Sequence, residues 1–307
     1  MKIVIVGAGA MGCLYGAKLS AVSSNEVYLL DVWKEHIDAI RSRGLIVEEQ
    51  GADVVYRNVK AVSKAEEAGF CDLAVIFVKS TLTARAVEGN KAVFGPGTTA
   101  LTLQNGLGNI ELISKAVSAG NVIAGTTAHG ATMLGPGKMR HAGSGNTIIG
   151  GLDGKNNARV VLVAELLREA GLETDISDNV IGLVWDKLLV NVGINALTGI
   201  TGLCNGELLD FPEIEMLLEE AVKEAAAVAE AKGIALINKN PVAHTKEVCR
   251  ATAKNKSSML QDVTNRKPTE IQMINGAIVR EGKMAGVPVP VNEVLTNLIT
   301  FIQKKYA

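Results

Sequence analysis

Mostly apolar runs alternate with helical patterns through the first half of the chain. Such runs occur at residues 2–6, 26–30, 72–79, 98–103 and 122–127. The segments that follow the first two runs, up to about residue 21 and over 34–43, have the spacing of helices. Strands that are apolar on both faces and separated by helices indicate a parallel sheet with helices packed on both sides.

The pattern changes after residue 130. Gly135-Pro136-Gly137 separates the runs 131–134 and 138–142, which predicts a turn between antiparallel strands, and 146–150 is expected to pair nearby. Helical patterns dominate from about residue 155, at 158–170, 180–197, 214–232, 242–254, 269–285 and 292–305. The sequence therefore predicts an α/β domain over residues 1–178 and an all-helical domain over 179–307.

Composition narrows the class of protein. The 31 basic and 32 acidic residues give a net charge of −1, which argues against a nucleic-acid binder. No apolar run approaches the ~18 residues of a membrane span, and the glycine-rich start suits a turn better than a signal peptide. The four cysteines have no metal or paired spacing and favour a reduced, cytoplasmic protein without a metal site.

The first glycines match a dinucleotide-binding fingerprint. Gly7-Ala8-Gly9-Ala10-Met11-Gly12 reads G-x-G-x-x-G, follows a strand and opens a helix. Gly7 would permit the tight turn, Gly9 the approach of a pyrophosphate and Gly12 the close packing of helix and strand. The pyrophosphate would lie at the helix N-terminus, where free N–H groups and the helix dipole favour an anion. We expect a Rossmann domain; a glycine-rich turn without a ligand is the alternative.

Asp31 follows the second predicted strand at the position of a ribose-binding carboxylate. A carboxylate there accepts the ribose hydroxyls and repels a 2′-phosphate, which predicts NADH over NADPH. Lys34 and Arg41 are close enough in sequence to weaken that preference, and a helix-capping role is the other interpretation of Asp31.

Lys79 and Asn105 come at the ends of two further predicted strands. Ligands of open α/β sheets bind outside the carboxyl ends of parallel strands, so both side chains are candidates for a cofactor site. Asn105-Gly106 is also an ordinary turn dipeptide, and the two interpretations of Asn105 stay open.

A polar stripe interrupts the apolar segment WDKLLVNVGINALT. Lys187, Asn191 and Asn195 are four residues apart, which puts them on one helix face over about 12 Å. A solvated face is the ordinary interpretation, but Asn is a poor helix former, and the stripe favours a functional cleft. Gly199 is expected to end this helix.

The segment SSMLQDVTNRKPTEIQMING, residues 257–276, has a structural interpretation of its own. Thr269 and Gln272 fit a capping box, with Glu270 in the first turn of a helix, where its charge complements the helix dipole. Ser257, Ser258 and Asp262 could likewise be capping or surface residues.

Taken together, GAGAMG, VKS, QNG, the K-x-x-x-N-x-x-x-N stripe and SSMLQD…TEIQMING resemble the ketopantoate reductases (2-dehydropantoate 2-reductases) over nearly the whole chain. The resemblance implies a Rossmann domain and a helical domain that reduce 2-dehydropantoate to (R)-pantoate, on the route to pantothenate and coenzyme A. It implies Lys187 as the general acid and Glu270 beside the lysine, substrate and cofactor. Asn191, Asn195 and Ser258 would be substrate ligands, Asn105 would lie near nicotinamide and substrate, and Lys79 would line the cleft.

The resemblance fits the chemistry of a ketone reduction. The nicotinamide supplies a hydride, and a lysine ammonium can supply the proton to the emerging alkoxide. Family members that prefer NADPH, the usual cofactor, commonly carry a basic residue where this chain has Asp31, so an NADH-preferring branch is expected.

Two alternatives remain beside this interpretation. One is an NAD-dependent D-2-hydroxyacid dehydrogenase that acts on other branched or aromatic 2-oxo acids; the other is a non-catalytic dinucleotide-binding module. The apolar helices suggest a homodimer without showing which face pairs. His129 and His141 could lie near the cleft or in packed positions, and packing is favoured.

Overall fold

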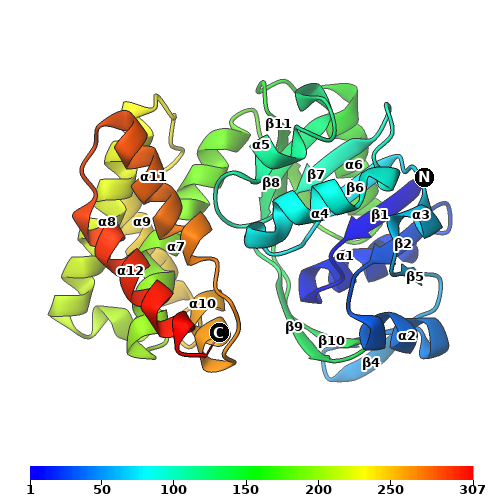
Figure 1. Ribbon diagram of the computed structural model, residues 1–307, viewed down its shortest axis with the longest axis horizontal. Helices are drawn as coiled ribbons and strands as arrows, with labels where there is room; N and C mark the ends of the chain where they lie inside the picture. Colours follow the sequence, from blue (N-terminus) through cyan, green and yellow to red (C-terminus); the bar gives the residue numbers. More distant parts are fainter. Residues whose placement is uncertain (307) are drawn as a thin grey trace. The chain divides into compact units, whose positions relative to one another are not determined.

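The computed structural model describes residues 1–306 and divides the chain into two compact units. Unit 1 comprises Met1–Gln104 and Asn109–Val180, and unit 2 comprises Asn105–Gly108 and Ile181–Ala307. Unit 1 contains the strands and the glycine turn, and unit 2 is helical (Figure 1). The four residues Asn105–Gly108, which separate the two parts of unit 1 in the sequence, thus belong to unit 2.

An eight-stranded sheet forms the centre of unit 1. Its spatial order is β12-β11-β8-β7-β6-β1-β2-β5, and every neighbouring pair is parallel except β8 and β11. The strands are β1 (Lys2–Val6), β2 (Glu26–Leu30), β5 (Lys60–Val62), β6 (Leu73–Ile76), β7 (Thr99–Thr102), β8 (Val122–Thr127), β11 (Thr147–Gly151) and β12 (Thr174–Ile176). The predicted parallel sheet is confirmed.

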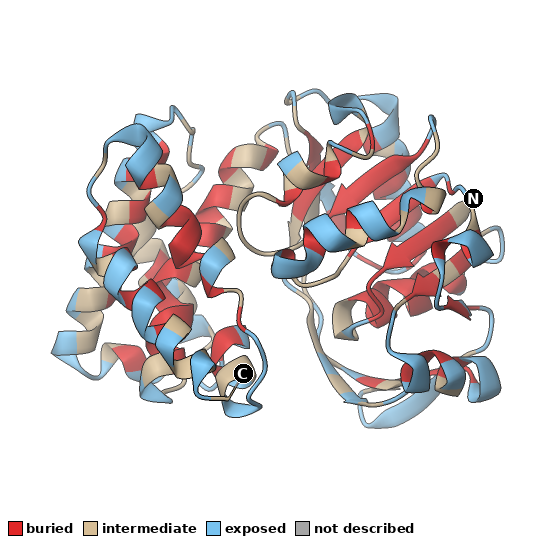
Figure 2. Ribbon diagram, in the orientation of Figure 1, coloured by how far each residue is buried: buried red, intermediate tan, exposed pale blue. Residues whose placement is uncertain are grey.

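Helices cover both faces of this sheet. In β1, Ile3 and Ile5 belong to one apolar cluster, whereas Val4 and Val6 belong to another, so no face of the strand meets water. Figure 2 shows the resulting buried strands. The helices are α1 (Ala10–Ser20), α2 (Lys34–Arg43), α3 (Ala65–Ala68), α4 (Thr83–Gly89), α5 (Asn109–Ile113) and α6 (Ala158–Glu169), with 3₁₀ turns η1 (Ser80–Leu82), η2 (Lys91–Val93) and η3 (Ala119–Asn121).

A second, four-stranded sheet completes unit 1. Its order is β4-β3-β10-β9, with β3 (Leu45–Glu49), β4 (Ala52–Tyr56), β9 (Gly130–Gly135) and β10 (Lys138–Gly143). β9 and β10 pair antiparallel, which confirms the hairpin predicted at Gly135-Pro136-Gly137. The hairpin of β3 and β4 has no counterpart in the sequence analysis.

Unit 2 is a bundle around the long helix α7. Its helices are α7 (Val180–Thr201), α8 (Pro212–Ala231), α9 (Pro241–Ala251), α10 (Ser258–Thr264), α11 (Asn275–Ala285) and α12 (Pro290–Lys304), with 3₁₀ turns η4 (Gly206–Leu209) and η5 (Ile271–Met273). Contrary to the prediction that no segment approaches a membrane span, α7 has the length and hydropathy of one, but 67% of its most apolar window is buried inside the protein. A helix at the centre of a packed bundle has this composition.

Two expectations for the helical half are wrong. Gly199 does not end α7, which continues to Thr201 and is followed by Gly202 in a left-handed conformation (φ +80°). The predicted helix 269–285 is broken: η5 comes first, Ile274 has φ −109° and ψ −97°, and α11 begins only at Asn275. Ile274 interrupts the helical hydrogen bonding because its ψ lies outside the helical range.

Candidate active site

The turn between β1 and α1 has the geometry that a dinucleotide cradle needs. Gly7 has φ +100°, and a Cβ on Gly12 would lie 2.0 Å from the Gly7 carbonyl oxygen. A Cβ on Gly9 would meet no protein atom within 4 Å, so its exposed face is open to a ligand. The first turn of α1 carries no acidic side chain, which leaves its positive end available for an anion.

Asp31 lies directly after β2, and its carboxylate is bound to the glycine turn. One oxygen accepts the Ala8 N–H at 2.7 Å, and the other accepts the Trp33 N–H at 2.9 Å. Trp33 is the N-cap of α2, so part of the capping interpretation holds as well. The same two bonds fix the carboxylate beside the turn, with lone pairs left over because each oxygen can accept two hydrogen bonds.

The residues next to Asp31 were missed by the sequence analysis. Val32 is 92% exposed, and the indole of Trp33 stacks on the buried His36 ring at 5.0 Å between centroids. His36 accepts the Gly137 N–H at 2.9 Å and lies 3.4 Å from the Cys13 sulfur. Burial lowers the pKa of His36, which keeps the ring neutral in this network. The sequence did offer a signal for these residues, because the apolar pair Val32-Trp33 directly follows the carboxylate Asp31.

Lys79 lies three residues past the end of β6, which is shorter than the predicted run 72–79. It is the N-cap residue of η1, and its carbonyl accepts the Leu82 N–H at 2.7 Å. Its side chain is half-buried in unit 1. Asn105, the other predicted strand-end residue, is half-buried in unit 2.

The polar stripe of α7 lies on a helix that is otherwise packed. Lys187 and Asn191 are half-buried, and Asn195 is only 4% exposed. The ordinary interpretation, a solvated helix face, does not describe side chains with so little exposure. Lys187, Asn191, Asn195, Ser258, Glu270 and Asn105, the predicted substrate-side residues, all belong to unit 2.

Lys187 has an altered acidity. Burial lowers the pKa of its ammonium to about 8, and the negative charge of Glu270 acts in the opposite direction. A lysine that titrates near neutral pH can give up a proton during a reaction, whereas an ordinary surface lysine holds it too tightly. Shifts of this kind favour a functional site over a structural ion pair.

Ser258 lies next to the far end of the stripe. Its hydroxyl is 3.5 Å from the side-chain nitrogen of Asn195, the upper limit for a hydrogen bond. The preceding residue, Ser257, is the N-cap of α10: it accepts the Leu260 N–H at 3.0 Å and shares a 2.7 Å hydrogen bond with Thr198. The capping function expected of this serine pair therefore falls to Ser257, and Ser258 is exposed.

The capping box predicted at Thr269 is absent. The N–H and hydroxyl of Thr269 both approach the Gln303 side-chain oxygen at 3.0 Å, and Gln272 donates to Thr300 at 3.1 Å instead of returning to Thr269. The reason is tertiary: α12 supplies partners for both side chains. Glu270 precedes the short turn η5 rather than a long helix, so dipole complementation accounts for little of its position.

A buried polar network supports the stripe and was not predicted. Asn275 donates to the carbonyl of Val192 on α7 at 3.1 Å and to the side-chain oxygen of Asn292 at 3.0 Å. Asn292 in turn donates to Glu224 at 2.8 Å, which joins α7, α8, α11 and α12. Such partners can be found only from coordinates, because the residues are far apart in sequence.

His129 and His141 form a packed pair within unit 1. Their Nδ1 and Nε2 atoms are 3.2 Å apart, and the ring of His129 packs edge-on against Tyr15. Burial lowers the pKa of His129. Among residues 1–306, no group of three or more His, Cys, Asp or Glu side chains could hold a metal ion.

Comparison with known proteins assigns the family. Residues 3–154 match the family "Ketopantoate reductase PanE/ApbA", and residues 179–303 match "Ketopantoate reductase PanE/ApbA C terminal". The 2-dehydropantoate 2-reductase of Halobacterium salinarum is 39% identical over 307 residues, 99% of each chain.

Solved structures agree over the whole chain. D-mandelate dehydrogenase in its ternary structure with NADH and anilino(oxo)acetate is 32% identical with a TM-score of 0.92, over 100% of this chain and 99% of that one. The PanE/ApbA family ketopantoate reductase of Ralstonia eutropha JMP134 is 34% identical with a TM-score of 0.91 and the same coverage. This chain belongs to the ketopantoate reductase family of nicotinamide-dependent oxidoreductases, as the resemblance of its motifs predicts.

Proposed function

We propose that the protein reduces 2-dehydropantoate to (R)-pantoate, with unit 1 binding the nicotinamide cofactor and unit 2 binding the 2-oxo acid. The observation that carries this proposal is the placement of Lys187, half-buried on the packed helix α7 in line with two neutral amides, where burial lowers its pKa to about 8. The family membership and the reductase named in Halobacterium salinarum support the substrate.

The glycine turn is the part of unit 1 that fits a dinucleotide. Gly7, Ala8, Gly9, Ala10, Met11 and Gly12 would hold the pyrophosphate, because a side chain at Gly9 would occupy open space that the ligand needs. When bound, the nicotinamide supplies a hydride. Asp31, held by the Ala8 N–H, would accept the ribose hydroxyls and favour NADH over NADPH. Lys79 would contact the cofactor.

Lys187 would act as the general acid. Its ammonium would stabilise negative charge on the ketone oxygen and then donate a proton to it. A pKa of about 8 keeps the group largely protonated at neutral pH while easing release of the proton. The positive charge also suits a substrate that carries a carboxylate.

The neutral side chains would orient the substrate without changing that charge balance. Asn191, Asn195 and Ser258 would bind its carboxylate and hydroxyl groups, and Asn105 would lie near substrate and nicotinamide. Glu270 would hold the Lys187 ammonium through opposite charge and contact substrate or cofactor, consistent with its effect on the lysine pKa.

A second candidate substrate class is supported by one observation. The D-mandelate dehydrogenase structure, solved with NADH and anilino(oxo)acetate, matches this chain over its full length with a TM-score of 0.92. A D-2-hydroxyacid dehydrogenase for aromatic or other branched 2-oxo acids would use the same lysine, amides and NADH.

A steady-state substrate panel separates the two candidates. We expect NADH oxidation with 2-dehydropantoate to exceed that with phenylglyoxylate or 2-oxoisovalerate by about a hundredfold in kcat/KM, the range that pocket contacts achieve. A hundredfold preference for phenylglyoxylate or 2-oxoisovalerate excludes pantoate formation and leaves the dehydrogenase. NADH binding without turnover of any 2-oxo acid would instead support a non-catalytic module.

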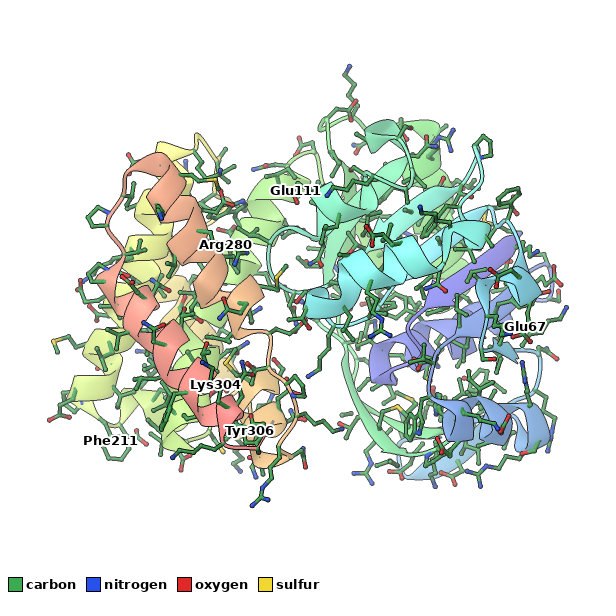
Figure 3. The ribbon with its side chains drawn as sticks, viewed as in Figure 1. Glu67, Glu111, Phe211, Arg280, Lys304 and Tyr306 are labelled. Carbon is green, nitrogen blue, oxygen red and sulfur yellow. The ribbon has the colours of Figure 1, made fainter. Side chains whose placement is uncertain are left out.

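We further propose that the protein is a cytoplasmic homodimer paired through α12. Val294, Leu298 and Phe301 form an apolar stripe on this helix, 56%, 43% and 57% exposed. Exposed Glu293 lies in the first turn of the helix and exposed Lys304, labelled in Figure 3, ends it, so two antiparallel copies would place opposite charges at both ends of the stripe. Sedimentation of Leu298→Asp should show a monomer. Leu162 in unit 1 is exposed to a similar degree, so Leu162→Asp should remain the wild-type dimer; a dimeric Leu298→Asp variant excludes this face.

A further inference from the structure

The six residues Gln104–Asn109 hold the chain where it leaves unit 1, enters unit 2 and returns. Both ends of the run are fixed in unit 1 by one buried hydroxyl. The Thr83 hydroxyl accepts from the Gln104 side chain at 2.9 Å and donates to the Asn109 side chain at 2.8 Å. Gln104 also donates to the carbonyl of Val78 at 2.6 Å. The two ends of the run, Gln104 and Asn109, are therefore held next to each other in unit 1.

The middle of the run is fixed in unit 2. The Leu107 N–H donates to the Met273 carbonyl at 3.0 Å, and the Leu107 side chain packs against the apolar core of the helical bundle. A backbone hydrogen bond and a partly buried side chain together hold Leu107, which explains why Asn105–Gly108 groups with unit 2. We call Asn105–Gly108 the hook.

Gly106 is the residue that lets the hook reach its anchor. Its φ is +82°, and a Cβ there would lie 2.4 Å from the Met273 carbonyl oxygen, a backbone atom that cannot rotate away. Gly108 has a similar φ of +94°, but its Cβ would meet only the flexible end of the Met273 side chain, at 3.4 Å. An alanine at either position would be strained by the positive φ, but only at Gly106 would its Cβ collide with a backbone atom.

Met273, which binds the hook through its carbonyl, also binds Glu270. The Met273 N–H donates to the Glu270 carbonyl at 2.9 Å, within the turn η5. Arg280 on α11, labelled in Figure 3, donates to the Gln272 carbonyl of the same turn at 2.6 Å. One short, braced turn therefore carries Glu270 on one side and receives the hook on the other.

From this arrangement we propose that the hook positions Asn105 by fixing this residue to the helical unit. Asn105 then meets the substrate as part of one group with Lys187 and Glu270, assembled before the cofactor binds, although its neighbours in sequence belong to the nucleotide-binding unit. The catalytic consequence rests on the proposed function. The physical anchoring does not, because it can be measured without turnover.

Hydrogen exchange tests the anchoring in the full-length protein without ligands. The Leu107 amide should be protected in the wild type and in Gly108→Ala, and it should exchange about tenfold faster or more in Gly106→Ala, because the added Cβ separates it from its acceptor. Equal protection of Leu107 in Gly106→Ala and Gly108→Ala overturns the proposal, as does a wild-type amide that exchanges like an exposed loop.

Kinetics test the consequence on the same variants. Gly106→Ala should lower kcat with the 2-oxo acid by about tenfold or more, the effect of misplacing a group by a fraction of an ångström, while NADH affinity measured by fluorescence titration changes far less than kcat. Gly108→Ala should retain most activity. Loss of NADH affinity in parallel with kcat would place Asn105 with the nucleotide-binding unit and overturn the inference. If the wild type reduces no 2-oxo acid, the proposed function fails, and the exchange result still decides the anchoring.

Discussion

Replacement of Glu270 by Gln tests the electrostatics of the site most sharply, because the change removes one charge and keeps the side-chain shape. The pKa of Lys187 is about 8, against 10.5 for a free lysine, with burial lowering it and Glu270 raising it. Without the carboxylate only the lowering influence remains. The pKa of Lys187 should therefore fall further, and never rise.

The expected size of the effect follows from the pairing. An opposite charge within ~4–6 Å shifts a pKa by roughly 1–3 units. A fall of one to two units from about 8 brings the lysine to about 6–7. At pH 7.5 the protonated fraction then drops from about 0.8 to between about 0.24 and 0.03, a loss of roughly 3- to 25-fold in general-acid activity.

The assay is the pH dependence of kcat/KM, which reports the free enzyme. The wild-type profile should decline as pH rises through about 8, because the ammonium is lost there. In Glu270→Gln the same limb should move to lower pH, with activity recovering on acidification. Glu293→Gln, which removes an exposed carboxylate from α12, is the control and should leave the limb in place. An alkaline limb that stays at pH 8 in Glu270→Gln, or moves upward, refutes the assignment.

Three further predictions concern stability and cofactor choice. Lys187→Met should abolish reduction yet raise the free energy of unfolding by up to roughly 3 kcal/mol, measured by urea denaturation. The pKa of Lys187 is about 8 in the folded protein and 10.5 in a free lysine. The gain in unfolding free energy should therefore be largest below pH 8 and decline as pH rises toward 10.5. Asp31→Asn keeps an acceptor for the turn and loses the charge, so the ratio of kcat/KM for NADPH over NADH should rise about tenfold; an unchanged ratio tells against the ribose role. Gly9→Ala should weaken NADH binding about tenfold at unchanged melting temperature, whereas Gly12→Ala, with its Cβ 2.0 Å from the Gly7 oxygen, should lower the melting temperature itself; equal thermal shifts in calorimetry would contradict this distinction.

The strands and helices of unit 1 could be predicted where local sequence alone determines them. The bounds of β1, β2 and α2 agree with the predicted 2–6, 26–30 and 34–43, because each of these segments is followed directly by a glycine or a charged residue. β3 and β4 were not predicted, because their pattern mixes charged residues with valines, and Val54 and Val55 are exposed. The exposed edge strand β4 is held by pairing with β3, and β3 in turn pairs with the distant β10, so these contacts cannot be found from the local pattern.

The helical half shows the limit more clearly. A 3.6-residue pattern over 269–285 could not reveal that Gln303 would take the Thr269 N–H and that Ile274 would break the helix. In contrast, the stripe of Lys187, Asn191 and Asn195 was readable because one helix fixes its geometry. The hook at Leu107 was not, since its partner Met273 lies far along the chain and the QNG sequence reads as an ordinary turn.

The most direct test of the account is single-turnover reduction of 2-dehydropantoate by Lys187→Ala at saturating NADH, with NADH affinity measured on the same sample. We expect a rate lower by about 10²–10⁴-fold, the usual contribution of a general acid, with NADH bound as tightly as in the wild type. Reduction at the wild-type rate without the ammonium would contradict it.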